Sequence, residues 1–140
     1  MRQLMREEHG SAVVEFLALS VLLMIPVVWF LLAIGQVQAA TYAATGAADQ
    51  GAKVHTTSTV SPEVAAEQAV TRTLSDYGVS AEHATVTRQC TPDCTSSGSV
   101  VSITVEVHVP LPGLPRISGV DLTLVNVSAT ASDVVRQEVP

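Results

Sequence analysis

One apolar run constrains this chain more than any other feature. Residues 12–35 read AVVEFLALSVLLMIPVVWFLLAIG, and Glu15 is the only charged residue among them. At about 1.5 Å per residue, a helix of this length extends about 36 Å, which exceeds the roughly 30 Å of a bilayer's hydrocarbon core. We therefore expect residues 12–35 to form a transmembrane helix in contact with membrane lipid.

Composition excludes two classes of protein. Of the 140 residues, 47% are hydrophobic and 14% are charged, whereas a disordered acidic chain has low hydrophobicity and high charge. Seven Lys and Arg face thirteen Asp and Glu, so the chain lacks the basic surface of a nucleic-acid-binding protein. The length suits one small domain in addition to the apolar run.

Basic residues predict the orientation of the span. Arg2 and Arg6 precede it, and Lys53 is the first basic residue after it. The positive-inside rule then places the N-terminus in the cytoplasm and residues 36–140 outside. We expect a single-pass protein of the cytoplasmic membrane whose exported part is acidic and soluble.

Two cysteines lie in the exported part, as Cys90-Thr-Pro-Asp-Cys94. In an oxidising compartment, this spacing across a Pro-Asp turn favours a local disulfide. A loop this short restricts the unfolded chain little, so we expect about 2 kcal/mol of stabilisation. The alternative, a zinc half-site, needs two further ligands, for which His83 and His108 are the nearby candidates.

Glu15 is not explained by a simple membrane anchor. A cleaved secretory signal has an apolar core of roughly 7–15 residues, shorter than this one, whereas an uncleaved anchor fits the length. A carboxylate within a span costs about 2.5–3.5 kcal/mol on insertion scales, and less near the interface. Glu15 either extends towards the cytoplasmic surface or has a charged partner within the membrane.

The residues before Glu15 favour a charged partner. Residues 1–10 form a short polar leader that ends at Gly10, and Ser11-Ala-Val-Val-Glu15 follows. This resembles a class III signal, the prepilin type, in which a membrane aspartyl peptidase cuts after glycine and the fifth mature residue is glutamate. The resemblance implies a new α-ammonium group on Ser11, one helical turn from Glu15 and within reach of a neighbouring chain.

Together with Phe16, this pattern resembles the TadE-like pseudopilins of tight-adherence (Tad/Flp) pilus systems, in the form typical of actinobacteria. The resemblance implies leader removal by a prepilin peptidase, methylation of the new amine, and a role as a minor subunit in pilus assembly. It also implies contacts with other pilin-like subunits and the pilus assembly platform, and a location in a pilus at the cell surface.

Two other classes of function compete with the pseudopilin. One is a single-pass anchor that displays an exported binding domain without any role in assembly. The other is an exported enzyme, which the sequence does not support because it contains no catalytic motif. We expect no catalytic residues, no cofactor and no metal.

We expect the helix to continue beyond the membrane, over residues 11–53, because Gln36 to Lys53 is rich in Ala and free of Pro. Small residues recur at spacing four: Gly35, Ala39, Ala43, Ala47, with a second row at Ala40, Ala44 and Ala48. Such rows allow close packing against other subunits. Equally, they can pack against the chain's own domain. Gly46 and Gly51 predict a break near residues 51–55.

Residues 54–140 are expected to form a small α+β domain of the pilin-like plan. Ser61 and Pro62 mark the start of a helix that ends at Tyr77, which we expect to be the large core residue. Strands are expected over residues 84–88, 101–109 and 120–135, in an antiparallel sheet, with a bulge near Asn126. We expect the histidines, including His55 in a polar loop, to be solvated.

Overall fold

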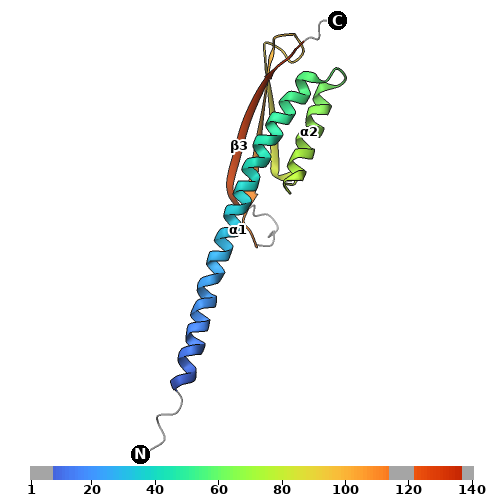
Figure 1. Ribbon diagram of the computed structural model, residues 1–140. Coiled ribbons are helices and arrows are strands. Elements are labelled where there is room, and N and C mark those ends of the chain that lie inside the picture. Colours follow the sequence, from blue (N-terminus) through green and yellow to red (C-terminus); the bar gives the residue numbers. More distant parts are fainter. Residues whose placement is uncertain (1–7, 114–121, 137–140) are drawn as a thin grey trace, which may run out of the picture. The chain divides into compact units, whose positions relative to one another are not determined.

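The computed structural model describes residues 8–113 and 122–136 and has the expected α+β fold (Figure 1). The first described element is helix α1 (Glu8–Thr57), and helix α2 (Pro62–Asp76) and a short 3₁₀ helix, η1 (Ala81–His83), follow. Three strands complete the described residues. The chain divides into two compact units, Met1–Ile34 and Gly35–Pro140, and α1 contributes to both.

The first unit contains the apolar part of α1. Its large apolar side chains, from Val13 to Ile34, are between 38% and 69% exposed among the described residues. The helix is unbroken through Pro26, and its most apolar stretch has a mean hydropathy of 2.7. A soluble protein does not leave so long an apolar surface uncovered. The helix therefore has the length and composition of a single membrane span.

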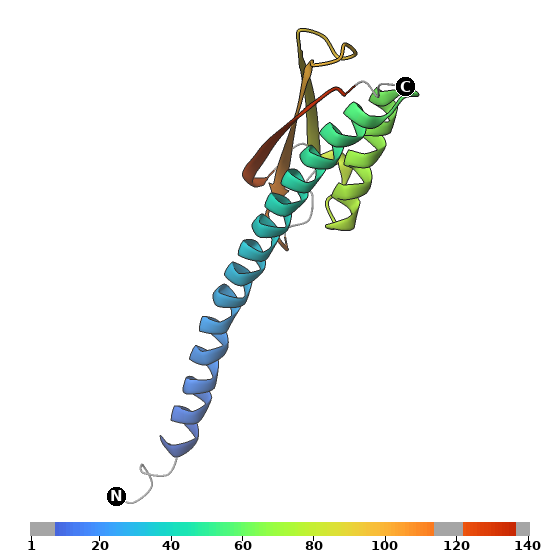
Figure 2. The ribbon, with the colours of Figure 1, turned by 45° about the horizontal axis from the view of Figure 1, so that its top comes forward.

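In the second unit, the C-terminal part of α1 and α2 form a helical hairpin beside the sheet (Figures 1 and 2). Ser61 occupies the N-cap position of α2 and Pro62 follows it, as the sequence predicted. Ser61 has a left-handed backbone, with φ of 49°, and its side chain makes no capping hydrogen bond. The position of the cap was therefore predictable, whereas its geometry was not.

The strands β1 (Ala84–Thr91), β2 (Val100–Pro110) and β3 (Thr123–Val134) form an antiparallel sheet in the order β1-β2-β3. β1 and β2 contain the predicted strands 84–88 and 101–109, and β3 covers residues 123–134 of the predicted strand 120–135, of which residues 120 and 121 lie outside the described residues. The register of β2 and β3 shifts where Val109 faces Val125 and Pro110 faces Thr123, which leaves Leu124 as the extra residue. The bulge thus lies two residues before its predicted position at Asn126.

The core of this unit consists of small and β-branched side chains. Val101, Ile103 and the other odd-numbered residues of β2 point inward and are at most 3% exposed, as their alternation predicted. Alanines of α1 and three residues of α2, among them Leu74, complete it. Tyr77 is 48% exposed, so its predicted place in the core was wrong. It caps the C-terminus of α2, after the last buried turn.

Helix α1 continues to Thr57, so the predicted break near residues 51–55 does not occur. Gly51 is buried, and a Cβ atom placed on it would lie 2.7 Å from Cγ2 of Val70 and 3.2 Å from Cδ1 of Ile103. Glycine here permits close approach of α2 and β2 rather than ending the helix. Packing of α1 against these elements outweighs the weak helix propensity of glycine.

Candidate functional site

The N-terminal motif lies at the start of α1. The backbone at Gly10 and Ser11 belongs to the first helical turn, because α1 begins at Glu8. Glu15 follows one turn after Ser11 and is exposed, and the Phe16 side chain beside it is 69% exposed. Glu15 and Phe16 therefore lie on an exposed surface of this helix.

The described residues supply no partner for Glu15. Its carboxylate has neither a hydrogen bond nor an ion pair with any side chain of residues 12–113 or 122–136. The apolar side chains around it are exposed, so it sits within a surface suited to lipid or to another apolar helix. Any charge that compensates Glu15 therefore lies outside the described side chains, in the rest of the chain or in another molecule.

The four small residues that were candidates for packing between subunits differ in how far they are buried. Ala43 and Ala47 are completely buried in the second unit, where they contribute to the core of their own domain. Ala39 is half-buried, and Gly35 is exposed with no atom within 4 Å of an added Cβ. The second row, Ala40, Ala44 and Ala48, is buried as well. Packing within the chain's own domain therefore accounts for Ala43 and Ala47.

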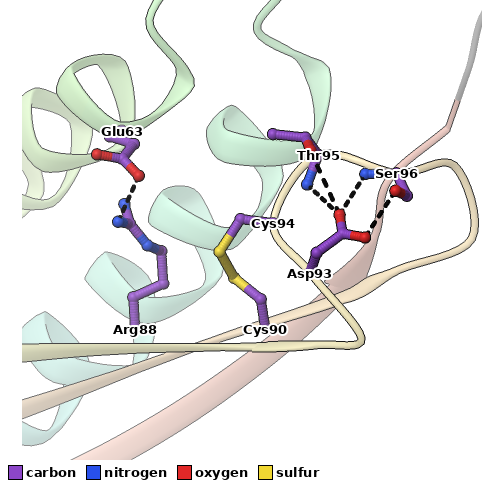
Figure 3. The surroundings of a disulfide bond; sticks show 7 residues. All are labelled: Glu63, Arg88, Cys90, Asp93, Cys94, Thr95 and Ser96. Carbon is purple, nitrogen blue, oxygen red and sulfur yellow. Dashed lines mark hydrogen bonds and ion pairs between the residues drawn. A yellow bond between two sulfur atoms is a disulfide. The ribbon is translucent and has the colours of Figure 1, made fainter.

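Cys90 and Cys94 form the predicted disulfide at the end of β1, with Cα atoms 5.1 Å apart (Figure 3). Each sulfur is bonded to the other, so neither is a zinc ligand. Between them, the carboxylate of Asp93 accepts hydrogen bonds from the Ser96 hydroxyl at 2.6 Å and from the backbone N–H groups of Ser96 and Thr95. These bonds lower the pKa of Asp93 to about 2. The loop is thus fixed by a covalent bond and by an ionised carboxylate.

An ion pair joins α2 to β1. A guanidinium nitrogen of Arg88 lies 2.6 Å from the carboxylate of Glu63, and Arg88 leaves β1 on the same side as Cys90 in Figure 3. A groove of about 620 Å³ is lined by residues of α2, β1 and β2, among them the apolar side chains of Val70, Val86 and Ile103. Both members of the ion pair and Glu67 also line this groove.

A second polar contact joins α1 to β3. The hydroxyl of Thr56 donates a hydrogen bond of 2.6 Å to the carboxylate of Asp133. This bond is the main reason why the pKa of Asp133 lies below its ordinary value, with a smaller contribution from the backbone N–H of Val134. Asp133 faces the helical side of the sheet, opposite Val101 in the register, so it anchors the last turn of α1 to β3.

Replacing Thr56 with valine tests this anchor. We expect Thr56→Val to lower the free energy of unfolding by about 1 kcal/mol at pH 7, because a hydrogen bond to a partly exposed charged group is lost. The folded pKa of Asp133 is below 3.8, so this stabilisation is present above that pH and is lost as the pH falls through the folded pKa. Urea denaturation at pH 7 and at pH 3 measures the difference in unfolding free energy between the variant and the wild type at each pH.

The matched control is Thr57→Val, because Thr57, like Thr56, donates to the backbone oxygen of Lys53 but has no carboxylate partner among the described residues. Equal losses for the two variants at pH 7, or a difference that does not shrink in acid, would contradict the role assigned to Asp133.

Sequence reasoning missed these contacts because each joins residues far apart in the chain. Thr56 and Asp133 are 77 residues apart, and Glu63 and Arg88 are 25 apart. His55 was expected to be solvated but is 3% exposed, because α1 extends to Thr57 and carries it into the core. His108 is on the outer face of the sheet, as predicted, where its Nδ1 lies 2.9 Å from Oδ1 of Asn126.

Among the described residues, no group of three or more His, Cys, Asp or Glu is arranged to hold a metal ion. Comparison of the chain with protein-family models, with curated proteins and with solved structures gives no significant match. The functional interpretation consequently depends on the N-terminal motif, the apolar span and the domain that follows it.

Proposed function

We propose that this protein is a TadE-like pseudopilin, a minor membrane-anchored subunit that acts in the assembly of a Tad/Flp-type pilus. The observation that carries the proposal is the sequence Gly10-Ser-Ala-Val-Val-Glu15-Phe16 at the start of α1, directly before an uncovered apolar helix. A small antiparallel α+β domain that packs on the C-terminal part of the same helix is the plan expected of a pilin-like subunit.

In this proposal, a prepilin peptidase cuts between Gly10 and Ser11. The bond lies in the first turn of α1, where most backbone N–H groups have no helical partner. Opening one terminal turn costs little, so the peptidase gains access without disturbing the rest of the helix. Glycine at the cut leaves the backbone unshielded by a side chain.

Cleavage gives Glu15 the opposite charge that the described residues do not supply. The new α-ammonium of Ser11 pairs with Glu15 of the same chain or of a neighbouring subunit, which offsets the cost of a carboxylate in lipid. Phe16 and the exposed apolar side chains then pack against other pilin-like helices. The N-terminus lies in the cytoplasmic membrane, and residues 36–140 face outward towards the assembly platform and the other subunits.

Sequencing the N-terminus of membrane-extracted protein tests the processing step. Co-expressed with a prepilin peptidase, the wild-type chain is expected to begin at Ser11. We expect Gly10→Val to reduce processing by about a hundredfold, because a branched side chain at the cut costs about 2–3 kcal/mol of fit in the peptidase subsite.

Gly35→Val is the control, since it makes the same change at an exposed helical position outside the motif. A wild-type chain that still begins at Met1 in the presence of an active peptidase would refute processing. That result would favour an uncleaved anchor that displays an exported binding domain.

A further inference from the structure

His55 is the buried ionisable side chain that the proposed function does not use. It lies in the last turn of α1 and is 3% exposed. Neither Nδ1 nor Nε2 is within hydrogen-bond distance of any protein group among the described residues. Gly51, one turn earlier on the same face of α1, is in close contact with Val70 of α2 and Ile103 of β2. His55 therefore lies on the face of α1 that holds α2 and the sheet.

The charged groups around His55 do not favour its protonation. Arg88 of β1 repels a positive imidazole, and Glu63 of α2, which attracts it, is already paired with Arg88 at 2.6 Å. The inward side chains of β2 are apolar, and Asp133 of β3 accepts from Thr56, the next residue of α1. On α1 itself, Lys53 is exposed and paired with Asp49.

Burial is the largest influence on this imidazole. It lowers the pKa of His55 below 6.5, and the repulsion by Arg88 acts in the same direction. The C-terminal end of a helix favours a positive charge, but only by about 0.3–1 kcal/mol. The folded domain therefore favours the neutral form of His55. A proton that His55 takes up in acid creates an unpaired charge in the core, which costs free energy.

We propose that His55 is an acid-sensitive latch: when its imidazole takes a proton from solvent, α2 detaches from α1 and β1 while α1 remains on β3. The two sides of α1 respond differently because their polar contacts differ. The pKa of Asp133 lies below its ordinary value of 3.8, chiefly because of the hydrogen bond from Thr56, so at pH 5 the carboxylate is still ionised and the Thr56–Asp133 bond is kept. On the other side, Arg88 repels a protonated His55. The buried positive charge therefore weakens the packing of α1 against α2.

Hydrogen–deuterium exchange on the full chain in detergent micelles tests the latch. After correction for the intrinsic effect of pH, amides of residues 62–76 are expected to exchange about tenfold faster at pH 5 than at pH 7.5. Amides of β2 and β3 are expected to change less than about twofold. His55→Leu, which retains an apolar side chain of similar size, removes the difference, whereas the exposed control His108→Gln retains it.

Three outcomes would overturn the latch: equal acceleration in α2, β2 and β3, an unchanged α2, or the same acceleration in His55→Leu. A second measurement does not depend on a variant that folds. Proton NMR of the wild-type imidazole is expected to show His55 titrating below 6.5 in step with the exchange of α2 amides. Titration of His55 at or above 6.5 would also contradict the proposal.

Discussion

Replacing Glu15 with alanine is expected, under the proposed function, to abolish association of this chain with pilin-type subunits while leaving its insertion in the membrane intact. Glu15 has no charged partner among the described residues and lies among exposed apolar side chains. Removing its charge makes the span more apolar, so insertion improves. It also removes the pairing with the Ser11 ammonium that the proposed function requires, and we expect recovery of cross-linked complexes to fall at least about tenfold.

Cross-linking of epitope-tagged chains in membranes measures association, and the amount of chain that remains in the membrane fraction after alkali extraction measures insertion. Glu15→Asp keeps the carboxylate and is expected to retain part of the association, and Val14→Ala controls for loss of side-chain volume beside it. If Glu15→Ala associates as well as the wild type, the chain is better described as a plain anchor. That outcome does not bear on the latch at His55, because the latch depends on the second unit alone.

Replacing Gly51 with valine is expected to lower the free energy of unfolding of the second unit, residues 35–140, by about 2–3 kcal/mol. A Cβ atom at this position lies 2.7 Å from Cγ2 of Val70, whose branched side chain has little rotamer freedom on a helix. α2 and β2 would both have to move away from α1. For a domain of about 100 residues, this corresponds to a fall in Tm of roughly 8–20 °C.

Gly35→Val gives the comparison, because nothing lies within 4 Å of its added Cβ. Both substitutions change the helix propensity of α1 by the same small amount, so the difference in Tm isolates packing. Thermal unfolding followed by circular dichroism measures it. Similar values of Tm for the two variants would mean that the contact of Gly51 with α2 is not a constraint on the fold.

The parts of the fold that could be predicted are those that depend on local sequence patterns. Alternation from residue 101 to 109 predicted the buried face of β2, because a strand has a period of two. Ser61 and Pro62 predicted the start of α2, and the spacing of Cys90 and Cys94 predicted the disulfide. Each of these signals is contained within about ten residues.

What could not be predicted depends on which segments meet in space. Gly51 looked like a helix breaker because its propensity is visible in the sequence, whereas its contacts with Val70 and Ile103 are not. His55 was placed in a loop for the same reason. At the candidate site, the order of Gly10, Ser11 and Glu15 can be read directly from the sequence. The burial of Ala43 and Ala47 by their own domain depends on tertiary packing and cannot.

The burial of those alanines determines what a neighbouring molecule can touch on α1 beyond Gly35. The side that remains exposed there is hydrophilic, and Thr41 and Thr45 on it already donate to backbone oxygens of their own helix. Tyr42, at 65% exposed, is the large side chain available on that side. The exposed surface of α1 is thus of two kinds. Before Gly35 it is apolar, so a contact made there is disrupted by detergent. After Gly35 it is polar and includes Tyr42, so a contact made there competes with hydration by water.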